Sequence, residues 1–202
     1  MLPSLIIATV VLGSAVYFYF YQLWPHRHRG HKTPLRIPSD WHFKIAYRYI
    51  QISTPLYALM SVVNYQLPWP GYIAWMGLLV SMSSVVLFVW SMLSLRGRYS
   101  HCFDSFVPDA LVRRGPYGVI RHPIYTANCL MLLGVFLSTA SWGVLVSCII
   151  LAVYYYRAAV WEEIALTQNL PGYAEYRSRT GGFLPRVPRW ADQKKLAASR
   201  CE

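Results

Sequence analysis

Long runs of apolar residues constrain this chain more than any other feature of its sequence. A helix that crosses a membrane needs about 20 mostly apolar residues. Five segments reach or approach that length: Leu2–Trp24, Tyr49–Leu67, Tyr72–Leu95, Ile124–Thr139 and Trp142–Trp161. Only 13% of the residues are charged, whereas soluble domains have about 25%. We therefore predict an all-α, polytopic membrane protein with about five transmembrane helices.

The fourth and fifth segments form a predicted pair. The fourth is short, and only Ala140–Ser141 separates it from the fifth, so we expect a membrane hairpin. The first segment has the hydrophobicity of a signal peptide. No Lys or Arg precedes it, however, and no small-residue cleavage site stands out, so we expect it to be a retained span.

The charge of the chain is strongly basic and unevenly distributed. There are 19 Lys and Arg residues against 8 Asp and Glu, a net charge of +11. This excess could indicate nucleic-acid binding, but the apolar runs favour membrane topology instead. All of the Lys and Arg residues fall in 25–48, in 96–121 or from 157 onward, on one side of a five-span arrangement. The positive-inside rule makes that side cytoplasmic, with the N-terminus outside and the C-terminus inside.

Cysteine and histidine residues do not form a metal-binding pattern. The four cysteines are scattered without a CxxC pair, so we expect free thiols. His26, His28 and His31 share a basic loop, but no carboxylate or cysteine accompanies them at ligand spacing. We expect no metal site, and we expect this loop to face lipid headgroups.

The polar residues of the predicted hairpin concentrate at its two inner ends. Pro123 suits the first turn of a helix, which leaves His122 at the cap and Tyr125 on the same face. The free N–H groups of a helix N-terminus favour an anionic group. The fifth segment ends in Glu162 and Glu163, and acids at a membrane edge are costly unless they are paired, hydrated or functional.

The same residues also have structural interpretations. The two glutamates could reach water, or form an ion pair with Arg121 or Arg157. Tyr125 could anchor its helix in the interface, and Asn128 is expected to form an interhelical hydrogen bond. Serines at the centre of the third segment, among them Ser84, would let helices approach closely.

A family resemblance rests on three motifs that follow one another in the chain: GPYGVIRHPIYTAN, WEEIAL and PGYAEYRSRTGGFLPR. Together they resemble the membrane-embedded isoprenylcysteine carboxyl methyltransferases and the related phospholipid N-methyltransferases. The resemblance covers about Leu95 to Pro188. It implies S-adenosylmethionine as methyl donor, held in a cytoplasmic pocket that the C-terminal segment closes.

The resemblance also implies roles for individual residues. Those it places at the donor are Leu111, Val112, Tyr117, His122, Pro123, Ile124, Tyr125 and Glu162. Asp104 or Asp109 could contact the donor from the preceding loop, and Glu163 could take a proton from an amine acceptor. Where the carboxyl methyltransferases carry an Arg one turn before the EE pair, this chain has Ala158. The adjacent Arg157 is the candidate substitute, and this departure puts prenylcysteine in doubt as the acceptor.

The sequence thus predicts an integral-membrane, S-adenosylmethionine-dependent methyltransferase. It would transfer the methyl group in line to a carboxyl or amine of a lipophilic acceptor that enters from the bilayer, among membrane lipids and without nucleic acid. The alternative is an NADPH-dependent membrane sterol or steroid reductase of related fold. A channel is disfavoured because no predicted span carries a mid-membrane charge. The predicted parts are N-terminal helices in 1–95, a methyltransferase core in 96–190 and a tail in 191–202.

Overall fold

The computed structural model describes residues 2–23, 70–95 and 110–186, together with a few positions between 45 and 60. Its elements are α1 Leu2–Leu23, α3 Gly71–Leu95, the 3₁₀ turn η1 Gly115–Gly118, α4 Pro123–Thr139, α5 Trp142–Asn169 and α6 Tyr173–Arg179. A single parallel bridge pairs Ile120 with Gly181, and no strand occurs within these described ranges. The predicted all-α class is confirmed for the described part of the chain.

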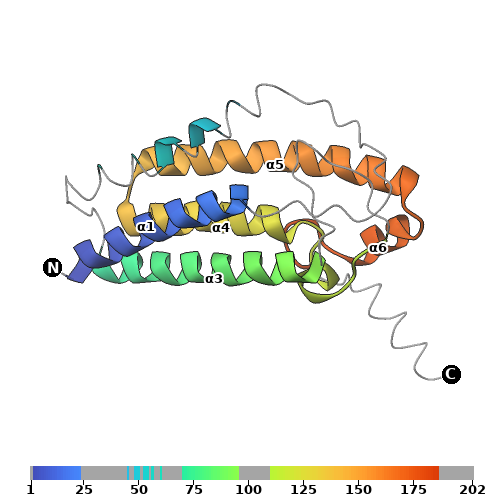
Figure 1. Ribbon diagram of the computed structural model, residues 1–202, viewed down its shortest axis with the longest axis horizontal. Helices are drawn as coiled ribbons and strands as arrows, with labels where there is room; N and C mark the ends of the chain where they lie inside the picture. Colours follow the sequence, from blue (N-terminus) through green and yellow to red (C-terminus); the bar gives the residue numbers. More distant parts are fainter. Residues whose placement is uncertain are drawn as a thin grey trace, which may run out of the picture.

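The four long helices lie side by side along the long axis of the molecule (Figure 1). The turn η1 and the short helix α6 lie together at one end of this bundle. The shared core draws on all four long helices and centres on fully buried Leu132, Leu151 and Tyr155. The polar motifs of the sequence are therefore gathered at one end of an apolar bundle.

Two described helices, α3 and α5, are long and apolar enough to cross a membrane, with 25 and 28 residues. Only 33% and 28% of their apolar windows are buried, so both direct apolar surface outward, as lipid-facing helices do. Helix α4 and the stretch Ala8–Tyr17 of α1 are shorter apolar helices. Most of the second predicted span, nearly all of 25–48, residues 96–109 and residues 187–202 lie outside the described residues. The five-span count, the hairpin and the orientation of the termini therefore stay predictions.

Helices α3 and α4 approach each other closely at two glycines. A Cβ on Gly77 would lie 2.6 Å from the Gly134 oxygen, and a Cβ on Gly134 would lie 2.7 Å from the Gly77 oxygen. Beside this contact, the Ser84 hydroxyl donates a hydrogen bond of 2.7 Å to the Ala127 oxygen. The small residues of α3 thus have the role that the sequence predicted for them, which is to let a neighbouring helix pack at short range.

We expect Gly77→Ala to destabilise the protein by about 1–3 kcal/mol, because the new methyl group would meet main-chain atoms that cannot move aside. Thermal unfolding of detergent-purified protein measures this loss. Gly13→Ala is the matched control, since a Cβ on Gly13 of α1 meets nothing within 4 Å. Equal unfolding temperatures for the two variants would contradict the close α3–α4 contact.

The turn η1 is attached to the end of α3. The guanidinium of Arg114 donates two hydrogen bonds to the Ser94 oxygen, at 3.0 and 2.8 Å. Gly115 has a φ of +58°, and a Cβ there would lie 3.1 Å from Trp90 Nε1, so the position favours glycine on both counts. This attachment sets the position of Tyr117, which follows two residues later.

Helix α5 is longer than a membrane crossing requires. It starts at Trp142, two residues after Ala140 closes α4 with a φ of 54°. Its 28 residues exceed the roughly 20 needed to span the hydrocarbon. The last two turns, beginning near Glu162 and Glu163, therefore extend beyond the apolar part of the bundle.

Candidate functional site

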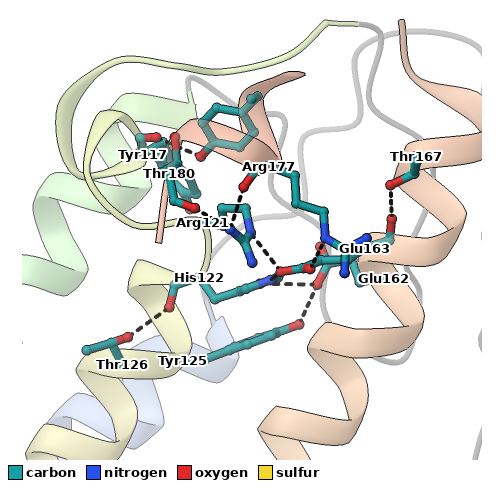
Figure 2. Close-up of polar contacts among 11 residues, drawn as sticks. Tyr117, Arg121, His122, Tyr125, Thr126, Glu162, Glu163, Thr167, Arg177 and Thr180 are labelled. Carbon is teal, nitrogen blue, oxygen red and sulfur yellow. Dashed lines mark hydrogen bonds and ion pairs between the residues drawn. The ribbon is translucent and has the colours of Figure 1, made fainter. Parts of the chain in front are cut away.

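The inner ends of α4 and α5 meet, and four predicted site residues are in contact there. His122 Nε2 lies 2.9 Å from Glu163 Oε1, and the Tyr125 hydroxyl donates a hydrogen bond of 3.0 Å to Glu162 Oε2. His122 Nδ1 lies 3.8 Å from the same Glu162 oxygen. Figure 2 shows the imidazole and the phenol from α4 directed toward the two carboxylates from α5. The RHPxY and EE motifs therefore form one cluster.

The two adjacent glutamates have different surroundings. Glu163 is 6% exposed and lies among three basic side chains. Arg121 Nε contacts its Oε1 at 2.8 Å, and Arg177 Nε contacts its Oε2 at 2.9 Å, in addition to His122. The Glu162 side chain is 27% exposed and faces Tyr125. Glu163 is thus a buried, compensated charge, whereas Glu162 keeps an accessible carboxylate.

Residues 180–183, which we call the C-terminal strap, lie across the start of α4. The backbone N–H of Arg121 donates to the oxygens of Gly181 and Gly182, and that of His122 donates to Gly182 at 3.1 Å. Arg121 Nη1 also donates to the Thr180 oxygen. Thr126 Oγ1 donates to an oxygen of the strap at 3.0 Å. The strap therefore holds the RHP segment mainly through its main-chain carbonyls.

Aromatic rings form a stacked column beside the carboxylates. The His122 and Tyr125 rings are 5.3 Å apart and nearly parallel, at 2°. Tyr125 and Tyr155 are 4.5 Å apart at 6°. Phe183 of the strap stacks on His122 at 5.5 Å. Flat aromatic faces next to an accessible carboxylate suit a ligand with both an aromatic and a cationic part.

Three tyrosines outside the apolar bundle surround this cluster, and all keep their protons at neutral pH. Burial raises the pKa of Tyr117 well above its ordinary value, and the negative charge of Glu162 raises it further. Burial raises the pKa of Tyr176 to about 12, and its hydroxyl donates to the Tyr117 oxygen at 2.6 Å. The pKa of Tyr173 is raised by burial and then by both glutamates. The Tyr176 phenol uses its proton in the bond to the Tyr117 oxygen, and the phenols of Tyr117 and Tyr173 also stay protonated.

The other predicted donor residues lie around this centre in different settings. Pro123 and Ile124 are buried at the start of α4, and Ile124 belongs to the main core. Leu111 packs against a second apolar cluster at the end of α5 and in α6, and Val112 is half-buried beside it in the chain. Arg157 is exposed on α5, six residues before Glu163, which places the two about 120° apart around the helix. Asp104 and Asp109 lie outside the described residues.

The sequence predictions did not include several residues that the structure brings to the site. They are Arg177, Thr180, Gly181, Gly182 and Phe183. The adjacent glycines Gly181 and Gly182 were a sequence signal for this segment, because glycine allows a close backbone approach. The structure shows such an approach: a Cβ on Gly181 would lie 2.8 Å from the Arg186 nitrogen. Where the described residues are concerned, no three His, Cys, Asp or Glu side chains gather as metal ligands would.

The chain matches a protein-family model over about half of its length. Residues 72–171 match the family described as phospholipid methyltransferase. This segment runs from α3 through α5 and contains His122, Tyr125, Glu162 and Glu163, but it ends before α6 and the strap.

Two curated proteins are similar to this chain over 100 residues. The cobalt-zinc-cadmium resistance protein CzcN of Cupriavidus metallidurans is 34% identical over 49% of this chain and 43% of its own length. The nickel-cobalt-cadmium resistance protein NccN of Alcaligenes xylosoxydans xylosoxydans is 30% identical over the same shares. The match therefore covers less than half the length of either relative.

Proposed function

Residues 72–171 belong to the phospholipid methyltransferase family, and from that premise we propose that this protein uses S-adenosylmethionine to methylate a lipophilic acceptor in the membrane. The observation that carries the proposal is the meeting of the two motif ends. His122 contacts Glu163 at 2.9 Å and Tyr125 contacts Glu162 at 3.0 Å, although 37 to 41 residues separate the partners in sequence.

The side chains of the cluster fit the chemical groups of this donor. The accessible carboxylate of Glu162 suits the ammonium group or a ribose hydroxyl of the donor. The faces of Tyr125 and His122 suit the adenine ring and the sulfonium cation. Arg121 and Arg177 both contact Glu163, so guanidinium groups lie close enough to the cluster to suit the carboxylate of the donor as well. When bound, S-adenosylmethionine supplies an activated methyl group.

The residues of this chain would contribute mainly by positioning the reactants. Holding two reactants in line at short distance supplies most of the rate in such a displacement. The Phe183 ring of the strap stacks on the His122 end of the aromatic column and would help to shield it. A carboxylate acceptor needs no base, whereas an amine acceptor must release a proton. Arg121, Arg177 and His122 already contact Glu163, so we assign proton release to Glu162 or to water, and Glu163 to positioning.

Membership in this family supports methyl transfer over the NADPH-dependent reduction that the sequence left open. The names of the two relatives describe metal resistance and do not specify an acceptor. We propose that the acceptor reaches the cluster from the bilayer, because the helices that carry the cluster have apolar outer faces. We also propose that this end of the bundle is cytoplasmic.

A labelling experiment tests this function. Membranes that contain the protein are incubated with methyl-labelled S-adenosylmethionine, and the labelled molecule is identified by mass spectrometry. We expect label in the lipid extract above the level of membranes without the protein. No excess label, together with no donor binding by the purified protein, would reject the proposal. Consumption of NADPH with a sterol substrate would favour the reductase.

A further inference from the structure

A hydrogen-bonded polar cluster lies inside the bundle, apart from the carboxylates. Asn128 of α4 is fully buried. Its Oδ1 accepts a hydrogen bond of 2.7 Å from the Tyr17 hydroxyl of α1, and its Nδ2 donates one of 2.7 Å to the Tyr155 hydroxyl of α5. A buried amide is unfavourable in an apolar environment unless it is hydrogen-bonded. Here both ends of the amide are bonded, each to a different helix.

This cluster is connected to the candidate site through stacked rings. The Tyr155 ring, whose hydroxyl accepts from Asn128, stacks on the Tyr125 ring at 4.5 Å and 6°. The Tyr125 hydroxyl in turn donates to Glu162 Oε2 at 3.0 Å. An unbroken series of contacts therefore runs from Tyr17 to the accessible carboxylate.

We propose that Asn128 is a positioning residue for the donor site, acting through Tyr155 and Tyr125 on Glu162. The inference rests on the proposed function. Asn128 sets the position of the Tyr155 phenol and thereby the plane against which Tyr125 stacks. Without the amide, both rings gain freedom, and the Tyr125 hydroxyl no longer holds the Glu162 carboxylate in one orientation.

The proposal also gives α1 a role in the site. Tyr17 lies outside residues 72–171, the segment that matches the family. Its hydroxyl bonds to Asn128, and its ring packs edge-on against Phe88 of α3 at 5.0 Å. A helix outside the family segment would thus help to set the geometry of the donor site.

The test measures equilibrium binding of labelled S-adenosylmethionine to detergent-purified protein, alongside thermal unfolding without donor. Asn128→Leu keeps a similar size and removes both hydrogen-bonding groups, and we expect it to raise the Kd of the donor by about fivefold or more. Tyr155→Phe keeps the stacked ring and removes the hydroxyl, so it should raise the Kd less. If Asn128→Leu does not fold, the Tyr155→Phe variant still tests the proposal.

Two comparisons separate positioning from a merely structural role. Loss of folded protein lowers the number of binding sites and leaves the Kd of the remaining molecules unchanged. Ser138→Ala is the matched control, because Ser138 of α4 also donates an interhelical hydrogen bond, to the Ala74 oxygen at 3.2 Å, far from Tyr155. In a Tyr125→Phe background, Asn128→Leu should have little further effect on the Kd, since the connection to Glu162 is already removed.

The outcomes distinguish the two proposals. No binding of S-adenosylmethionine by the unsubstituted protein overturns the proposed function and this inference with it. Normal binding by the unsubstituted protein with an unchanged Kd in Asn128→Leu and Tyr155→Phe overturns the inference alone. Equal rises of the Kd in Asn128→Leu and Ser138→Ala, or fully additive effects with Tyr125→Phe, also overturn it.

Discussion

Replacing Glu162 by glutamine is expected to weaken binding of S-adenosylmethionine by roughly 10- to 100-fold, the range for losing a hydrogen bond to a charged group. Glutamine can still accept from the Tyr125 hydroxyl, so the local packing is retained. It lacks the negative charge that would attract the ammonium group of the donor. Titration of the purified variant with labelled donor measures the effect.

Glu175→Gln is the matched control for this charge change. Glu175 is an exposed acid on α6 that pairs with Arg179 at 3.1 Å and has no described contact with the cluster. We expect its donor affinity to equal that of the unsubstituted protein. Equal affinities in Glu162→Gln and Glu175→Gln would show that Glu162 does not hold the donor.

Replacing Glu163 by alanine is expected to lower stability by about 3–5 kcal/mol, because it leaves the largely buried guanidinium of Arg121 without its counter-charge. For a chain of this size, that loss corresponds to a fall in unfolding temperature of about 10 °C. Arg121 loses its carboxylate partner while its side chain stays 14% exposed. Thermal unfolding of detergent-purified protein, without donor, measures the change.

A smaller effect is expected when only the exposed partner is removed. The Arg177 side chain is 50% exposed, so Arg177→Gln should cost no more than about 1 kcal/mol. If Glu163 were instead the proton acceptor of the reaction, Glu163→Gln would abolish methyl transfer to an amine while the unfolding temperature stayed the same. That result would reject the positioning role assigned here.

Much of the helical organisation could be predicted because local signals mark the ends of the elements. The predicted third segment, Tyr72–Leu95, corresponds to α3 at Gly71–Leu95, and the fourth, Ile124–Thr139, corresponds to α4 at Pro123–Thr139. Proline at a first turn and short polar breaks between apolar runs carry this information. The number of transmembrane spans depends partly on residues that the structure does not describe, so the five-span count stays a prediction.

The core of the site could also be predicted, because it depends on which helix ends meet. His122, Tyr125, Glu162 and Glu163 come together as the sequence predicted, and Asn128 forms the interhelical hydrogen bonds expected of it. Their roles with a donor stay predictions.

The partners of Glu163 could be predicted only in part. The sequence left Arg121 and Arg157 open as ion-pair candidates, and the structure places Arg121 at the carboxylate, with Arg177 on its other side. The C-terminal segment was expected to close the pocket, but its individual contacts were not predicted, because Thr180 and Gly182 contribute main-chain oxygens, which any residue possesses. A contact that spans about 60 residues and uses no distinctive side chain leaves no pattern in the sequence.

The position of the strap has a consequence for how the protein is made. Residues 180–183 follow α4 and α5 in the chain, so they leave the ribosome after both helices. Until then the Arg121 guanidinium lacks the Thr180 carbonyl and must remain hydrated. Docking of the strap onto the start of α4 is therefore a late step in folding, and the contacts around Arg121 are complete only after it.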